Sequence, residues 1–353
     1  MTSPIVDRLV QALLYEGYIL YPYRPSVKNR KRWTIGGLYP RGYSEADGNG
    51  DPQAMQTECL VTGRQPVISV SVRFLHLMDR LVGKLREPAR ELRAEGEPDF
   101  DVVESLEVGG RLHQTWQEAV ERTVSIGNVD VTELVARPRR QEFAFPALRA
   151  TETLCDPNGD VRAVLVRNQQ AVAGAIALSA AQIAEEVFRL TIVAVNESSL
   201  ADPERTSRDE AILATLASAH TILHVERGEF VSLLEPPDEL QSAAAECSNL
   251  RTWPVLAGQP GETDTLLSSP IILYDYPQVA PESPGDLFDG TEIDEILTLR
   301  IMTLTDEEKR VAKAVDERAR ALLQRTESLG PGQLRQLHGA LRGAHALDLK
   351  EKP

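Results

Sequence analysis

Hydrophobic residues recur at two different spacings along this chain. In residues 4–16, Ile5, Leu9 and Leu13 fall on one face at helical spacing, and Ser3-Pro4 supplies a start signal. From residue 56 the spacing changes, and apolar side chains alternate with polar ones through 66–77. The pattern predicts an N-terminal helix followed by strands.

Several later segments alternate in the same way. We expect 56–61 and 66–77 to form a β-hairpin and the charged stretch 79–97 to be a short helix or a solvated loop. A second hairpin is expected in 220–237, turned by Arg227-Gly228. Further strands are expected at 118–126, 140–148, 161–168, 170–180 and 186–198. Their spacing and the turn residues between them favour an antiparallel sandwich.

The predicted fold class is therefore α+β, mainly β: a central antiparallel β-sandwich with an N-terminal helix and a C-terminal helical segment. Residues 304–330 carry the C-terminal helix signal, because Thr305 and Glu308 form a capping-box pattern. We divide the chain into an aromatic and basic α+β region (1–115), the sandwich (116–255), an extended proline-rich acidic arm (256–303) and C-terminal helices (304–353).

Composition argues against a nucleic-acid-binding, membrane-spanning or secreted protein. The formal net charge of −15 disfavours non-specific binding to nucleic acid. No apolar run reaches the ~18 residues of a membrane span, and the first residues lack a secretory pattern. Three widely spaced cysteines, Cys59, Cys155 and Cys247, suggest reduced thiols. We expect a cytoplasmic protein, with a homo-oligomer compatible with the sequence.

Charge and aromatic residues gather near the two ends. Residues 1–43 hold seven Lys/Arg against Asp7 and Glu16, and six of the eight tyrosines. We call residues 15–43 the head. Between Arg251 and Arg300 there is no Lys or Arg, but there are nine Asp/Glu. We call residues 256–303 the arm.

Tyr, Trp and Arg dominate the energetics of protein interfaces, so both segments are candidate partner-binding surfaces. In the head the candidates are Tyr18, Tyr21, Tyr23, Arg24, Arg30, Arg32, Trp33 and Tyr39. In the arm they are Tyr274, Tyr276, Asp286, Phe288, Asp289 and Glu292. Head and arm can also pair with each other, and the head has the composition of a nucleic-acid patch. The overall charge makes this last alternative the weaker one.

The other alternative is a metal-binding protein or a metal-dependent enzyme. His220 and His224 share a face on either a helix or a strand, and Glu226 can join them on a strand. Asp47, Asn49, Asp51 and Glu58 have EF-hand spacing, but Pro52 replaces the glycine that such a loop requires. The acidic set of the arm can also hold a divalent ion: Asp275, Glu282, Asp286, Asp289, Glu292, Asp294 and Glu295.

Catalytic motifs are missing from the sequence. It contains no GxSxG, no GxxxxGK[ST] and no GxGxxG after a strand, and no base lies near a cysteine in the sequence. We therefore predict no catalytic residues and no cofactor, and an enzyme is the less favoured interpretation.

Two stretches resemble a known family. They are LLYEGYILYPYRPSVKNRKRWTIGGLYPRGYSE near the start and LSSPIILYDYPQVAPESPGDLFDGTEIDEILTLRIMTLTDEEK near the end. They resemble a family of uncharacterised accessory proteins encoded beside bacterial NiFe-hydrogenase structural and maturation genes, particularly those of the actinobacterial, high-affinity type. The resemblance implies a role in hydrogenase maturation or assembly through a protein partner, and it carries no catalytic residues over. The chain lacks the paired CxxC motifs of hydrogenase subunits.

Overall fold

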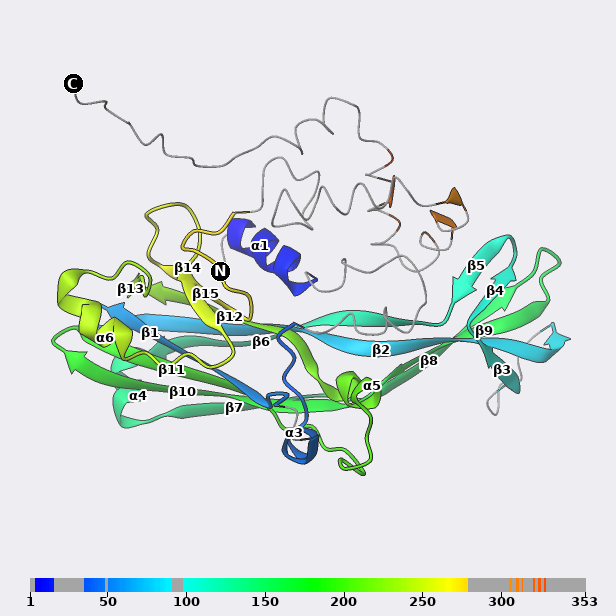
Figure 1. Ribbon diagram of the computed structural model, residues 1–353, viewed down its shortest axis with the longest axis horizontal. Helices are drawn as coiled ribbons and strands as arrows, with labels where there is room; N and C mark the ends of the chain where they lie inside the picture. Colours follow the sequence, from blue (N-terminus) through cyan, green and yellow to red (C-terminus); the bar gives the residue numbers. More distant parts are fainter. Residues whose placement is uncertain are drawn as a thin grey trace, which may run out of the picture.

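The computed structural model describes residues 4–15, 35–47, 50–90 and 98–278, and a few positions between Thr305 and Glu327. The fold is mainly β, with two large antiparallel sheets packed face to face (Figure 1). This confirms the predicted α+β, mainly β class. The helices are α1 (Pro4–Leu14), α3 (Arg41–Asp47), α4 (Val131–Ala136), α5 (Arg208–Ala211) and α6 (Gln241–Ala245), with 3-10 turns at Ile212–Ala214 and Asp238–Leu240.

The larger sheet has the strand order β14-β15-β12-β2-β9-β8, and β6 and β3 also pair with β2. Its strands are β14 (Trp253–Leu256), β15 (Thr265–Ser269), β12 (Leu216–Glu226), β2 (Val67–Ala89), β9 (Val161–Gln169), β8 (Leu148–Cys155), β6 (Trp116–Asp130) and β3 (Phe100–Val103).

The smaller sheet has the order β13-β1-β11-β10-β7. Its strands are β13 (Glu229–Val231), β1 (Ala54–Thr62), β11 (Val187–Asn196), β10 (Val172–Ala184) and β7 (Arg139–Phe145), and a separate hairpin joins β4 (Ser105–Val108) to β5 (Arg111–Gln114). The two main sheets therefore take strands from Ala54 to Ser269, so they extend past both limits of the 116–255 segment.

Strand β2 is the central strand of the larger sheet and pairs with four other described strands. Its first half pairs with β12 and β6, and its second half pairs with β9 and β3. The expected helix or solvated loop from residue 79 is therefore wrong as far as Ala89. The charged residues belong to the strand because neighbours on both sides satisfy its backbone groups. This long strand gives the molecule its elongated shape (Figure 1).

Both expected hairpins are wrong in the same way. β1 and β2 lie in opposite sheets, and so do β12 and β13. A Cβ on Gly63 would lie 2.6 Å from the Arg227 carbonyl oxygen, and one on Gly228 would lie 2.5 Å from the Thr62 carbonyl oxygen. The two turns thus pack against each other where the chain crosses between the sheets, and this close approach requires glycine.

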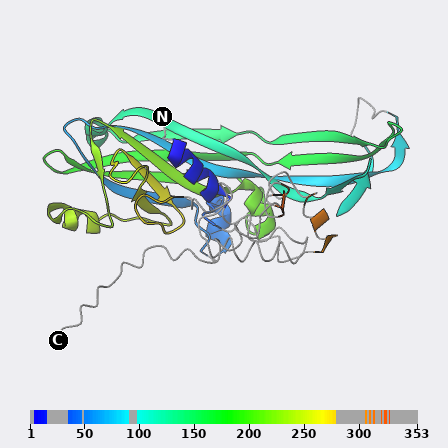
Figure 2. The same cartoon turned by 90° about the horizontal axis from the view of Figure 1, so that it is seen from above.

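Buried apolar side chains of the described residues gather in five clusters, and three of them bear on the sheets and α1. The first fills the sandwich, where Val70 and Phe74 of β2 meet Ile176 of β10 and Leu190 of β11. The second lies on the other face of the larger sheet, which α1 covers (Figure 2). Leu323, from the C-terminal segment, is also buried in this second cluster. A third, smaller cluster lies beneath the β4–β5 hairpin at the far end of β2.

Candidate functional site

Most residues predicted to bind a partner lie outside the described part of the chain. In the head these are Tyr18, Tyr21, Tyr23, Arg24, Arg30, Arg32 and Trp33. In the arm they are Asp286, Phe288, Asp289 and Glu292. Tyr39, Tyr274 and Tyr276 are described, and the structure gives each a different environment.

Tyr39, one of the residues predicted to bind a partner, is buried in the fold. It is 2% exposed, and its ring stacks on Tyr43 with centroids 5.5 Å apart. The guanidinium of Arg208 lies 5.2 Å from the Tyr39 centroid and makes two hydrogen bonds to Asp51. Burial raises the pKa of the Tyr39 hydroxyl well above its usual range. These groups anchor the segment before α3 to the sandwich.

The described parts of the head and the arm meet beside β12. Leu38 exchanges backbone hydrogen bonds with Leu216, and the Ala219 N–H donates to the Gly36 carbonyl at 3.0 Å. A Cβ on Gly36 would clash with the Pro270 ring. Pro270, which directly follows β15, therefore packs against Gly36 of the head. Ser218, with φ +50°, marks the irregularity in β12 at this junction.

Residues 270–278, which we call the strap, are fixed to the sandwich along one side. Asp275 accepts hydrogen bonds from the Ser232 hydroxyl and from the Leu256 N–H. The Tyr276 N–H donates to the Leu256 carbonyl at 2.7 Å, and the Tyr276 side chain packs against the sandwich core. Leu273 is 8% exposed and belongs to the cluster under α1. Asp275 and Tyr276 are therefore anchors.

The other side of the strap is apolar and open. Ile272 is 72% exposed and Tyr274 is 85% exposed, while Leu273 between them is buried. This alternation places both exposed side chains on one face of an extended segment. Trp253 is also exposed and lies on β14. Leu234 is exposed too, and it lies next to the Ser232–Asp275 hydrogen bond. Large apolar side chains that gather on a surface are typical of protein-binding sites, so Ile272 and Tyr274 are the candidate contact residues.

The two predicted metal-binding histidines do not form a metal site with Glu226. His220 is fully buried, and its Nδ1–H donates to the Ser218 carbonyl at 2.8 Å. Burial lowers its pKa to about 4, so the ring is neutral near pH 7. His224 contacts the Thr265 hydroxyl instead. Within the described residues, no three His, Cys, Asp or Glu side chains gather closely enough to hold an ion.

The EF-hand spacing is coincidental in the fold. Asp47 ends α3, Asp51 pairs with Arg208, and Glu58 lies in the middle of β1. The Glu58 carboxylate accepts hydrogen bonds from the Thr191 hydroxyl and the Ser248 N–H. An EF-hand loop is followed by a helix, whereas Glu58 is a paired strand residue, so these residues do not form an EF-hand. Of the acidic set in the arm, Asp275 is the member that the structure describes.

Neither Cys59 nor Cys247 supplies an activated thiol. Burial raises the pKa of Cys59 well above its usual range and that of Cys247 to about 11. Both therefore carry a proton near neutral pH. Cys155 is exposed at the end of β8.

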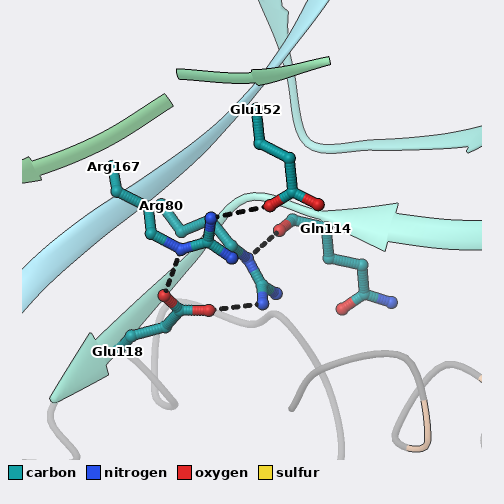
Figure 3. Close-up of polar contacts among 5 residues, drawn as sticks. All are labelled: Arg80, Gln114, Glu118, Glu152 and Arg167. Atoms are coloured by element: carbon teal, nitrogen blue, oxygen red, sulfur yellow. Dashed lines mark hydrogen bonds and ion pairs between the residues drawn. The ribbon is translucent and has the colours of Figure 1, made fainter. Parts of the chain in front are cut away.

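A chain of four charged residues crosses the larger sheet, and sequence reasoning missed it (Figure 3). Glu118 on β6 accepts hydrogen bonds from Arg80 on β2 at 2.7 Å and from Arg167 on β9 at 2.9 Å. Arg167 also donates to Glu152 on β8 at 2.9 Å. We call this set the charge ladder. No signal in the sequence marks it, because its members come from four strands.

The charge ladder is suited to holding strands together rather than to catalysis. Both Glu118 oxygens are occupied by arginines, and the Arg80 Nε–H donates to the Gln114 carbonyl. Burial lowers the pKa of Arg80, and the attraction of Glu118 opposes that effect. Two positive and two negative charges leave the set neutral. Glu118 cannot act as a base without breaking both ion pairs.

The comparisons add no relatives. A scan against models of protein families finds no match for this chain, and a search of curated proteins also finds none. In the described part of the chain, no helix is both long and apolar enough to cross a membrane. The fold and site thus define a mainly β, sandwich-like protein with an exposed apolar strap.

Proposed function

We propose that this protein is a non-catalytic accessory protein that binds a protein partner through the strap. The observation that carries the proposal is the exposure of Ile272 and Tyr274 on a segment that is anchored from its other side. A pre-ordered strap loses little conformational entropy on binding, so its exposed side chains can contribute most of their burial energy. Tyrosine is also enriched among the residues that dominate interfaces.

We further propose that the partner belongs to NiFe-hydrogenase maturation or assembly. The strap lies within the second stretch that resembles the hydrogenase-associated family, and Gly36 lies within the first. The contact between Gly36 and Pro270 makes these two stretches neighbours in the fold. A shared surface is the simplest reason for two distant segments to carry the same resemblance.

A pulldown from the native host, grown so that hydrogenase is expressed, tests both proposals. The double variant Ile272→Ala/Tyr274→Ala should fold as the wild type does, because both side chains are mostly exposed. We expect the tagged wild type to recover hydrogenase subunits or maturation factors, identified by mass spectrometry. The double variant should recover at most about a tenth as much, as expected for the loss of ~1.4 kcal/mol or more.

Val102→Ala is the matched control, because Val102 is 56% exposed and lies on β3 at the far end of the molecule. It should recover as much partner as the wild type. Two results would overturn the proposals. If the wild type recovers no hydrogenase subunit or maturation factor, the hydrogenase role is wrong. If the double variant recovers as much as the wild type, the strap is not the binding site.

A further inference from the structure

Strand β7 lies at an open edge of the smaller sheet. Among the strands that the structure describes, it pairs with β10 on one side and with none on the other. Five of its residues are exposed, and Phe143 and Phe145 are half-buried. The outer backbone N–H and C=O groups of such a strand are free to pair with a further strand.

The sequence of β7 is complementary to itself in one antiparallel register. A two-fold axis perpendicular to the sheet keeps each side chain on its own face of the sheet. It therefore pairs an even-numbered residue only with an even-numbered one, and an odd-numbered residue only with an odd-numbered one. Centred on Gln141, it places Arg140 of each copy opposite Glu142 of the other. Centring on Arg140 or on Glu142 instead would place two like charges opposite each other, which is destabilising.

Charged side chains on an edge strand often prevent pairing. In β7, however, both signs are present at the spacing that matches them across the axis. Glu142 is also available for a new partner. Its side chain is 78% exposed, and its contact with Arg140 of the same strand is long, at 3.6 Å. Arg140 is 44% exposed and also pairs with Glu197 of its own copy at 2.7 Å, so in the dimer it would bridge Glu197 and Glu142 of the second copy.

The flanks of β7 support the same symmetry. Val135, four residues before β7, is 42% exposed, and Leu148, three residues after it, is 53% exposed. The two-fold axis through Gln141 brings the Val135 end of each copy to the Leu148 end of the other. Two apolar contacts would therefore flank the paired strands, one at each end.

We propose that this protein forms a two-fold dimer in which β7 pairs antiparallel with β7 of a second copy, centred on Gln141. The two smaller sheets then form one continuous sheet across the interface. The interface lies at the opposite edge of the smaller sheet from β13, beside which Ser232 anchors the strap. Dimer formation therefore leaves the strap free for its partner.

Sedimentation equilibrium of single and mixed variants tests the charge matching. Arg140→Glu places two carboxylates opposite each other across the axis, and Glu142→Arg places two guanidinium groups there. Each variant alone should therefore dissociate at least about tenfold more readily than the wild type. An equimolar mixture restores opposite charges at both positions, and should form a heterodimer about as stable as the wild-type dimer. Val102→Ala, on β3, should leave the wild-type equilibrium unchanged.

Two outcomes would overturn the dimer. One is a wild-type protein that sediments as a monomer at every concentration up to its solubility limit. The other is a wild-type dimer whose dissociation constant is unaffected by either charge reversal.

Cysteine cross-linking tests the register. In a Cys155→Ser background, Gln141→Cys places two thiols opposite each other, and facing Cα atoms in antiparallel strands lie within the range of a disulfide. Mild oxidation should link Gln141→Cys into a covalent dimer. Ala144→Cys is the control, because Ala144 lies opposite Pro138 in this register. Equal cross-linking of the two variants would show that the proposed register is wrong.

Discussion

At the residue scale, Glu118 offsets the repulsion between two arginines that the strand register places side by side. Arg80 and Arg167 are directly opposite each other on β2 and β9, an arrangement that is unfavourable for like charges. Glu118 binds both and cancels their repulsion. The side chains of Arg80 and Glu118 are 10% and 20% exposed, so water does little to screen this interaction.

Removing the central carboxylate should therefore cost much more than removing the terminal one. We expect Glu118→Gln to lower the free energy of unfolding by about 3 kcal/mol, because it leaves Arg80 charged and buried. Glu152→Gln should cost less than about 1 kcal/mol, because Glu152 is 57% exposed. Urea unfolding of both variants measures the difference. Equal losses would mean that Glu118 does not bridge the arginines.

His220 makes the fold sensitive to acid. Burial lowers its pKa from 6.5 to about 4, so below pH 6.5 the unfolded chain binds a proton that the folded chain does not. The stability that the neutral His220 ring contributes is fully present above pH 6.5 and is lost as the pH falls towards 4. The expected loss is about 3 kcal/mol over this window. Arg73, which faces His220 across the strands, opposes the imidazolium further.

A His220→Gln variant isolates this effect, because every other titratable group is the same in both proteins. We expect the unfolding free energy of the wild type to fall by about 3 kcal/mol more than that of His220→Gln between pH 6.5 and 4. Chemical denaturation at a series of pH values gives both curves. Parallel curves would show that His220 is protonated equally in the folded and unfolded chains.

At the element scale, α1 covers the outer face of the larger sheet. Val6, Leu9 and Leu13 share one buried cluster with Leu77 of β2 and Ile222 of β12. Its polar side is also attached: Arg73 donates to Asp7 at 3.1 Å, and Gln11 and Tyr15 both donate to Glu121. The helix thus supplies the second layer that an otherwise exposed apolar sheet face requires.

The packing of α1 can be tested at one residue. Leu13 is 1% exposed, so Leu13→Ala should leave a cavity and lower the free energy of unfolding by about 3 kcal/mol. Arg8→Ala, on the exposed side of the same helix, should change it by less than about 0.5 kcal/mol. Thermal and urea unfolding compare the two. A small effect of Leu13→Ala would mean that α1 contributes little to the stability of the fold.

At the scale of the whole molecule, stability should differ between the two ends of β2. Residues 67–77 lie over the sandwich core, whereas the far end is held by a small cluster that includes Val82, Val108 and Leu165. The far end therefore has fewer buried apolar contacts to lose when it opens, and local opening should occur there first. Figure 1 shows this end projecting beyond the smaller sheet.

Hydrogen exchange measures this difference directly. We expect the amides of 100–114 to exchange faster than those of 67–77. Val82→Ala should accelerate exchange at 100–114 and leave β11 unchanged, because Val82 belongs to the far cluster. Uniform exchange along β2 and its neighbours would instead indicate that the molecule opens as a single unit.

Local sequence patterns predicted where the strands lie better than which strands pair with each other. The strands β6, β9, β10 and β11 lie close to their predicted positions, because alternation along the chain reports which side of a strand is buried. Their assembly is different. The glycine turns at Gly63 and Gly228 fit either a hairpin or a crossing between sheets, so the sequence could not distinguish these outcomes. The second half of β2 was missed because its charged side chains are neutralised by residues distant in the sequence.

For the candidate site, composition pointed to the aromatic residues near both ends. Tyr274 is exposed, but Tyr39 is buried, and nothing in the local sequence separates the two. Burial of Tyr39 depends on Arg208 and Asp51, and exposure of Tyr274 depends on the anchoring of Asp275 by Ser232. The sequence alone therefore determined the fold class and the positions of the central strands, because these follow from local periodicity. The tertiary structure decided the strand partners, the charge ladder and the exposed strap, because these depend on contacts between distant residues.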